Sequence, residues 1–218
     1  TAGYCIRDYH DSGRQEVRNL FVTGMRDYAS KCYWHMLTRQ RTLLGLLAVS
    51  VALFLSSGSL LLALLAAPAL LAAAWRLLDS YFGWFIQLCL EDDLRDIQKT
   101  YLEGEDSHFW VAESDGEVVA TVGAKPSAPS GDGERRVWHA ELGPAVGQRK
   151  RGIARALCRT VLCFAQQRGY KGVTLIVGIW NWEGRRLYRS LGFREIDRIS
   201  PKVLVGKIFE DVILCYRY

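Results

Sequence analysis

The chain has 218 residues, 50% hydrophobic and 23% charged, which is enough for one globular core or for a smaller core with a membrane element. Its formal net charge of +5 favours anionic ligands or lipid head groups but is too small to indicate nucleic acid, so no nucleic-acid partner is expected. The six cysteines lie far apart, without C-x-x-C pairs or neighbouring histidines, so no metal site is expected. No secretory signal is expected at the beginning of the chain.

The first predicted elements are a short strand over Tyr4 to Tyr9 and a helix over Arg14 to Tyr28. Within the helix, apolar residues recur at helical spacing: Val17, Leu20, Phe21 and Met25. The chain therefore opens with a strand followed by a helix.

The next segment has the composition of a membrane element. No charged residue lies between Arg41 and Arg76, and residues 43–75 are almost entirely Leu, Ala, Val and Phe. As one helix this run would be about 50 Å long, whereas the hydrocarbon layer is about 30 Å thick. Because the cluster at 56–59, Ser-Ser-Gly-Ser, favours a turn, we predict a hairpin of two short helices, with residues 43–75 in contact with membrane lipid.

Positive charges flank this hairpin on both sides, at Lys31, Arg39 and Arg41 before it and at Arg76 after it. Their count places both ends on the cytosolic side of a membrane. Two full crossings and a re-entrant pair within one leaflet are both compatible with the helix lengths. A buried hairpin in the core of a soluble protein is the alternative, although this chain is short for enclosing one.

After the hairpin, an amphipathic helix is predicted over Asp92 to Leu102. Two strands follow, His108 to Glu113 and Val118 to Ala124, on either side of the pair Asp115-Gly116, which is a strong hairpin-turn signal. Residues 125–136, with two prolines and two glycines, are predicted to form a loop.

The second half of the chain continues to alternate strands and helices. A strand is predicted over Val137 to Val146, bulged or broken at Gly143-Pro144, and a helix over Ile153 to Arg168. The remaining predicted elements are a compact strand, a short helix and a final strand, at Val173 to Val177, Glu183 to Ser190 and Val212 to Tyr218. This order predicts a layered α/β domain with an α+β mixed sheet.

The most informative segment runs from Val146 to Ala154 and joins a strand end, a basic turn and a helix start. The first N–H groups of a helix lack intrahelical partners and lie at the positive end of its dipole, which favours phosphate. Gly152 leaves room for a diphosphate, and three side chains add positive charge: Arg149, Lys150 and Arg151. By itself, the pattern is equally compatible with a solvated basic loop, and it lacks the glycines of a nucleotide-binding fingerprint.

The same segment resembles the Q/R-x-x-G-x-G/A acetyl-CoA loop of GNAT acetyltransferases, with Arg149, Gly152 and Ala154 at the three defined positions. Residues 181–193, Asn-Trp-Glu-Gly-Arg-Arg-Leu-Tyr-Arg-Ser-Leu-Gly-Phe, are similar to the family's N-x-x-A-x-x-L-Y-x-x-x-G-F segment. With both motifs in order, the chain resembles a GNAT domain with an inserted hydrophobic helical hairpin. That arrangement resembles the camello-like, N-acetyltransferase 8-type membrane enzymes of the endoplasmic reticulum.

The resemblance implies three parts: residues 1–35 with the first strand and helix of the GNAT domain, residues 36–80 with the membrane hairpin, and residues 81–218 with the remainder of the catalytic domain. Since the outer parts form one domain, both ends of the hairpin emerge on the same membrane face. The implied location is the endoplasmic reticulum membrane, with the catalytic domain facing the cytosol.

The implied activity is acetyl-CoA-dependent N-acetylation of a small amine, such as a cysteine S-conjugate, or of a peptide lysine. Acetyl-CoA is the co-substrate. By the same resemblance, its binding residues are Val146, Arg149, Lys150, Arg151, Gly152, Ile153, Ala154 and Asn181. The oligomeric state is left open.

For catalysis, the resemblance makes Tyr188 the proton donor to the departing thiolate, and a core role in packing its short helix is the alternative. Glu141 and His139 lie two residues apart on one strand face, so either could accept the amine proton directly or through water, and Glu141 is taken as the base. Pro144 departs from the family pattern where a backbone N–H usually lies near the acetyl carbonyl. The alternative function is therefore a catalytically inactive GNAT-fold membrane interaction module.

Overall fold

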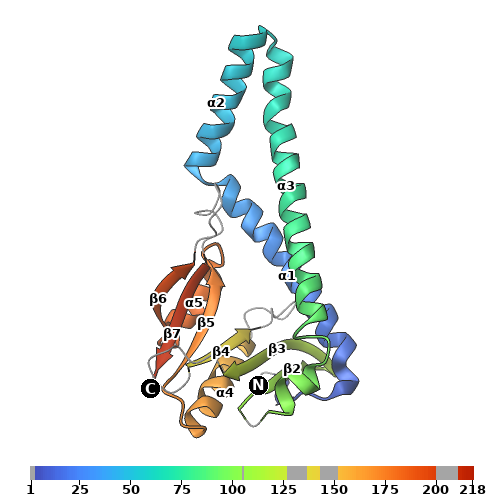
Figure 1. The fold of residues 1–218 in the computed structure, drawn as a ribbon, viewed down its shortest axis with the longest axis vertical. Coiled ribbons are helices and arrows are strands. Elements are labelled where there is room, and N and C mark those ends of the chain that lie inside the picture. Colours follow the sequence, from blue (N-terminus) through green and yellow to red (C-terminus); the bar gives the residue numbers. More distant parts are fainter. Residues whose placement is uncertain (1–2, 105, 127–136, 143–151, 200–210) are drawn as a thin grey trace. The chain divides into compact units, whose positions relative to one another are not determined.

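The computed structural model describes residues 3–104, 106–126, 137–142, 152–199 and 211–218, with residues 137–142 described by their backbone alone (Figure 1). The chain forms two compact units. One unit consists of residues 1–25 together with residues 88–218, and the other consists of residues 26–87.

The first unit contains a seven-stranded sheet with the strand order β1-β2-β3-β4-β5-β7-β6. Among the described strands, β4 and β5 run parallel and every other neighbouring pair runs antiparallel. The strands are β1 (Tyr4–Asp8), β2 (His108–Ser114), β3 (Glu117–Pro126), β4 (Val137–Leu142), β5 (Gly172–Gly178), β6 (Arg194–Ile199) and β7 (Asp211–Arg217). The predicted mixed sheet is confirmed.

The turn between β2 and β3 forms where the sequence predicts it. Asp115 has φ of 54° and Gly116 φ of 81°, so both central residues occupy the left-handed region that a tight two-residue hairpin turn requires. Aspartate and glycine tolerate this region better than most residues. Ser114 pairs directly with Glu117 across the turn.

Alternating side chains of β2 face two separate cores. Phe109 and Val111 belong to a cluster that includes Val17 from the start of α1 (Arg14–Leu37). Trp110 and Ala112 belong to a larger cluster with the buried face of α4 (Ile153–Gln167). The sheet therefore lies between two helical layers, as the period of two along a strand requires.

The helix α4 is amphipathic and its burial follows its sequence. Ile153, Leu157, Val161 and Ala165 recur every four residues and are all buried. The helix α5 (Trp182–Ser190) is shorter and buries Tyr188. Both helices lie close to their predicted bounds.

The second unit contains the hydrophobic segment, which folds into α2 (Gln40–Ser57) and the first half of α3 (Leu60–Glu91). Gly58, with φ of 65°, ends α2 and accounts for the predicted turn. Both helices are long and apolar enough to cross a membrane, by length and composition. Most of their large hydrophobic side chains are exposed.

The prediction of two short helices is wrong for the second, because α3 has 32 residues and continues well past Arg76. Residues beyond that arginine keep a helical apolar period, with Leu78, Phe82 and Ile86 buried at four-residue steps. The helix also continues through Pro68. Within this unit, the Tyr33 hydroxyl donates a hydrogen bond to a carbonyl of α3, that of Leu71, at 3.1 Å.

Two further elements differ from the sequence prediction. Residues 92–96 form turns and a bend, and in the predicted 92–102 helix helical structure begins only at residue 97, followed by the short π-helix η2 (Gln98–Leu102). The strand β6 was not predicted. It lies at the sheet edge, is mostly exposed and carries charged residues, with a register shift between Glu195 and Asp197, so it lacks the apolar alternation that identifies strands.

Candidate functional site

The strands β4 and β5 separate along their length. They pair only at their beginnings, where the last paired residues are His139 and Thr174, although β4 continues to Leu142 and β5 to Gly178. The part of β4 beyond His139 remains paired with β3 on its other side. Beyond this point, β4 and β5 do not hydrogen-bond to each other. The backbone N–H and C=O groups of β4 that face β5 could therefore bind a ligand that lies along β4.

The helix α4 begins beside this region, at the predicted phosphate-binding turn. Gly152 is its N-cap residue, with φ of 79°, and among the described residues no side chain caps the helix. A Cβ atom at Gly152 would meet no other atom of the described residues within 4 Å, so the described part of the chain leaves the space beside the helix start open. Ile153 is buried beneath it and anchors the first turn in the core. Uncapped N–H groups beside open space fit a diphosphate.

Four of the predicted binding residues, Val146, Arg149, Lys150 and Arg151, lie outside the described residues, as does Pro144. Of the rest, Gly152, Ile153 and Ala154 form the start of α4. Whether they bind acetyl-CoA stays a prediction.

Asn181 is the N-cap residue of α5 and is buried, with 8% of its surface exposed. Its side-chain oxygen accepts a hydrogen bond from the backbone N–H of Gly184 at 3.1 Å. A Cβ atom at Gly184 would come within 2.8 Å of Asn181 Nδ2, so the glycine leaves room for this cap. The structure thus gives Asn181 a capping role, and its contact with the coenzyme stays a prediction.

Tyr188 lies in the larger core cluster, 9% exposed. Its ring centroid is 5.8 Å from that of Phe193, with the rings at 63°. The packing role that the sequence left as an alternative is therefore present in the structure. A buried phenol can also serve as a proton donor if its hydroxyl reaches the reacting atoms, so the two roles are compatible.

The backbone of β4 places Glu141 and His139 at alternate positions of the strand, opposite Gly123 and Lys125 of β3. Glu141 belongs to the part of β4 that no longer pairs with β5, whereas His139 is the last residue that does. This register places the proposed base beside the open edge.

An arginine-rich network that the sequence did not single out holds α5 in place. The Glu195 carboxylate on β6 accepts hydrogen bonds or forms ion pairs with Arg198 at 2.6 Å, Arg189 at 3.4 Å and Arg185 at 3.5 Å. The hydrogen bond from Arg198, followed by the charges of the arginines, lowers the pKa of this carboxyl group. Arg185 and Arg189 flank Tyr188 on α5, so the network fixes the helix that carries it.

A second contact, which the sequence analysis did not predict, joins α4 and α5. The Arg155 guanidinium in the first turn of α4 donates a hydrogen bond to the Ser190 hydroxyl at the end of α5, at 2.7 Å. Arg155 directly follows the segment from Val146 to Ala154, and Ser190 belongs to the motif at residues 181–193. The 35 residues that separate them in the sequence give no indication that they are in contact. The contact couples the helix start proposed to hold phosphate to the helix that carries Tyr188.

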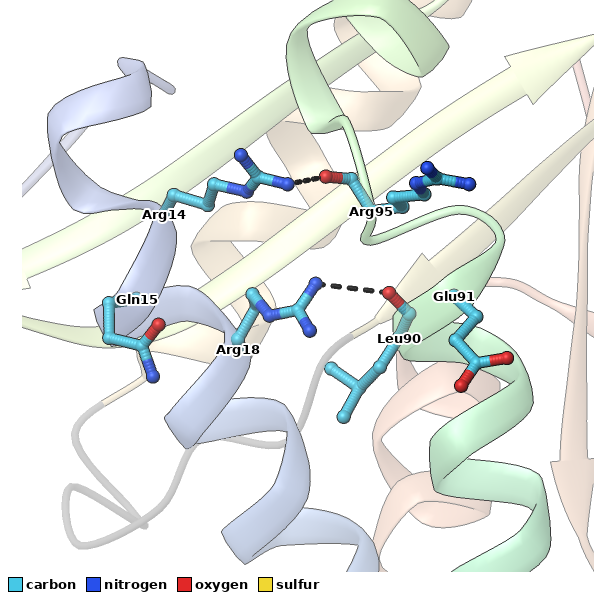
Figure 2. Close-up of a pocket in the computed structure, with 6 residues that line it drawn as sticks. All are labelled: Arg14, Gln15, Arg18, Leu90, Glu91 and Arg95. Carbon is cyan, nitrogen blue, oxygen red and sulfur yellow. Dashed lines mark hydrogen bonds between the residues drawn. The ribbon is translucent and has the colours of Figure 1, made fainter.

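A separate pocket lies between the start of α1 and the end of α3, lined by Arg14, Gln15, Arg18, Leu90, Glu91 and Arg95 (Figure 2). The α1 helix follows β1, whose last residue pairs near the start of β2. None of the residues that line the pocket belongs to β4, β5 or α4. The pocket is therefore distinct from the region where β4 and β5 separate.

Comparisons with known proteins show the family and the fold of the chain. Residues 71–193 match the profile of the acetyltransferase (GNAT) family. N-acetyltransferase 8 of Rattus norvegicus is 39% identical over 212 residues, which cover 97% of this chain and 91% of the relative.

Solved structures share the fold. An acetyltransferase of the GNAT family from Staphylococcus aureus Mu50 has a TM-score of 0.59 at 15% identity and covers 98% of both chains. The structure of yncA from Salmonella typhimurium with its cofactor acetyl-CoA has a TM-score of 0.55 at 14% identity, covering 99% of this chain and 94% of that one. At these identities the likeness shows the fold alone.

Proposed function

The chain belongs to the GNAT family of acetyltransferases and is an acetyl-CoA-dependent N-acetyltransferase, and on this basis we propose its acceptor class, its site residues and its membrane location. The predicted resemblance to N-acetyltransferase 8 proteins is confirmed, as is the GNAT fold. The proposed acceptor is a small amine, such as a cysteine S-conjugate, or a peptide lysine.

The observation that carries the proposed site is the separation of β4 from β5 beside an uncapped helix start. Gly152, Ile153 and Ala154 would present backbone N–H groups to the diphosphate of acetyl-CoA, supported by Arg149, Lys150 and Arg151. Val146 and the edge of β4 would hold the pantetheine arm, and Asn181 would contact the coenzyme with its amide nitrogen. Each of these residues is assigned from its position in one of the two motifs.

Acetyl-CoA supplies the activated acetyl group as a thioester. The acceptor amine must first lose a proton, and Glu141, in the part of β4 that no longer pairs with β5, would accept it directly or through water. Tyr188 would donate a proton to the departing sulfur. Its burial excludes water, and the network around Glu195 holds the orientation of its helix.

The membrane proposal rests on α2 and the apolar part of α3, which carry residues 43–75. Large hydrophobic side chains along both helices are exposed, and an aqueous environment would leave this surface uncovered. Positive residues flank the segment on both sides, which favours a cytosolic position for both ends. We propose the endoplasmic reticulum membrane, with residues 36–80 as the membrane hairpin and residues 1–35 and 81–218 as the parts of the catalytic domain.

The first experiment combines coenzyme binding with acetyl transfer. Calorimetry on the purified full chain is expected to show acetyl-CoA binding, and labelled acetyl-CoA with an amine panel is expected to show transfer. Absence of binding would contradict the proposed site. Normal binding without transfer to any amine would instead favour the inactive interaction module.

Tyr188→Phe tests the proton donor. We expect kcat to fall by about 10²-fold, because the phenylalanine keeps the ring contact with Phe193 but removes the donor. Tyr170→Phe is the matched control, since Tyr170 is a buried tyrosine of the same core cluster at the other end of β5. Equal kcat in wild type and Tyr188→Phe would remove Tyr188 from the mechanism and leave it a packing role.

A further inference from the structure

The part of α3 beyond Arg76 carries an exposed apolar stripe made of Leu77, Tyr81 and Trp84, called here the α3 stripe. Their exposed fractions are 73%, 53% and 61%. The ring centroids of Tyr81 and Trp84 lie 6.1 Å apart, so the two aromatic side chains occupy neighbouring positions on the helix surface. The stripe is a continuous surface feature.

Core packing does not account for this stripe. Leu78, Phe82 and Ile86 form the buried face of the same helix. At about 100° per residue, the α3 stripe lies to one side of that face, and a polar face with Asp79 and Gln87 lies to the other side. This part of α3 therefore has two apolar faces, and the fold buries one of them. An exposed apolar face with two large aromatic side chains indicates an environment that covers the apolar rings and leaves their polar ends in contact with water.

The length of α3 indicates what covers the stripe. The uncharged part of the helix, Leu60 to Trp75, rises about 24 Å, which is about 6 Å less than the hydrocarbon layer. A helix that crosses this layer must draw in about one more turn, while Arg76 extends its long side chain toward the head groups. From Leu60 to Trp84 the helix rises about 37 Å, which equals the hydrocarbon layer plus one head-group layer.

We propose that the α3 stripe is an aromatic anchor seated in the head-group layer of a phospholipid bilayer, and that α3 consequently crosses that bilayer completely. Tryptophan and tyrosine concentrate at this depth because their rings are apolar while the indole N–H and the phenol O–H remain hydrated. The stripe is continuous along one helix with the apolar segment, which favours lipid over a second copy of the chain. This inference rests on the proposed membrane anchoring.

The experiment measures tryptophan depth in the full chain, reconstituted in phosphatidylcholine vesicles. Lipids brominated near the head group or near the bilayer centre quench tryptophan emission at the corresponding depth. The emission of Trp84 is the difference between wild type and Trp84→Phe, which retains an aromatic ring. Two probes are added to the Trp84→Phe chain: Leu64→Trp within the apolar segment and Gln87→Trp on the polar face of the stripe's helix.

We expect shallow bromine to remove about half or more of the Trp84 emission and deep bromine to remove little of it. The Leu64→Trp probe should respond chiefly to deep bromine, and Gln87→Trp should respond weakly to both.

A quenched Leu64→Trp probe with an unquenched Trp84 would overturn the stripe proposal and leave the anchoring intact. The same pattern with chemical cross-linking of two chains through the α3 stripe would assign the stripe to a second copy instead, which also overturns the proposal. If neither Trp84 nor the Leu64→Trp probe is quenched, the proposed membrane anchoring is wrong, and the inference about the α3 stripe is wrong with it.

Discussion

Gly172 opens β5 at a point where the sheet admits no side chain. A Cβ atom there would lie 2.4 Å from the backbone carbonyl oxygen of Tyr216, the neighbour of its pairing partner Arg217. Since a backbone atom cannot rotate away, a larger residue must displace β7 from β5. Glycine is required at this position because the backbone of β7 lies too close for a side chain, and not because the residue has a left-handed φ.

Gly172→Ala is therefore expected to lower the free energy of unfolding by about 1–3 kcal/mol, measured by chemical denaturation of the detergent-solubilised chain. Gly13→Ala is the matched control, because a Cβ atom at Gly13 would meet nothing within 4 Å. Equal stability of the two variants would mean that the sheet accommodates the methyl group and that the close approach is not a constraint.

Glu195 makes a pH-dependent contribution to stability. Its pKa is lowered in the folded protein, first by the hydrogen bond from Arg198 and then by the charges of Arg198, Arg185 and Arg189. A carboxyl group with a lowered folded pKa stabilises the protein above its ordinary value of 4.5, and this contribution is lost as the pH falls through the folded pKa.

We expect Glu195→Gln to be less stable than wild type by about 0.5–1 kcal/mol at pH 7, since the ion pairs are only partly shielded from water. The difference should shrink as the pH falls below 4.5, where the wild-type carboxyl also becomes neutral. Denaturation at both pH values measures it. A difference that is constant with pH would show that the glutamine acts through shape and not through lost charge.

At the scale of elements, the end of α3 depends on side chains from α1. The Arg18 guanidinium donates a hydrogen bond to the carbonyl oxygen of Leu90 at 3.0 Å, and Arg14 donates one to the carbonyl of Arg95 (Figure 2). Arg18 also donates a hydrogen bond to the carbonyl oxygen of Leu94 at 2.7 Å. Carbonyls near a helix C-terminus lack intrahelical donors, and arginine supplies them. These contacts stabilise the turns at residues 92–96 where the sequence predicts a continuous helix.

Arg18→Met is expected to lower the free energy of unfolding by about 1.5–3 kcal/mol, because it retains the aliphatic part of the side chain and leaves two partly buried carbonyls without a charged donor. Gln15→Ala on the same turn is the control, since Gln15 bonds only an exposed neighbour, Asn19, among the contacts that the structure describes. Unchanged stability in Arg18→Met would show that water replaces the guanidinium at no cost.

The elements that sequence predicts well are those with a strong local signal. The β2–β3 turn follows from Asp115-Gly116, and α4 follows from its four-residue apolar period. The edge strand β6 has no such period, because its partners supply the pairing and solvent accepts its charged side chains. The break at residues 92–96 depends on arginines about 80 residues away, which no local pattern can indicate.

The candidate site divides in the same way. Gly152 and Asn181 are recognised by local motif, and the structure gives both of them N-cap positions. The separation of β4 from β5 and the contact of Arg155 with Ser190 arise from tertiary packing and have no local signature. The Glu195 network belongs to the same class, since its members come from α5 and β6.

At the scale of the whole molecule, the sheet-containing unit is formed by two chain segments separated by the apolar unit, residues 26–87. The segments meet at more than one place. Phe21 and Leu90 pack against the same core cluster, and Arg18 bonds carbonyls beyond the apolar unit. The ends to be joined therefore lie near each other, as in domains that accept large insertions.

A chain in which Met25 is joined to Leu88 through a short Gly/Ser linker is thus expected to remain folded without detergent. It should unfold cooperatively and bind acetyl-CoA about as tightly as the full chain, because both motifs and both cores are retained, while its association with phosphatidylcholine vesicles should be lost. Calorimetry and vesicle flotation measure these properties. The same splice carrying Arg18→Met should unfold more easily, since that side chain joins the two segments. An aggregated splice with a folded full chain would show that residues 26–87 contribute to the catalytic core.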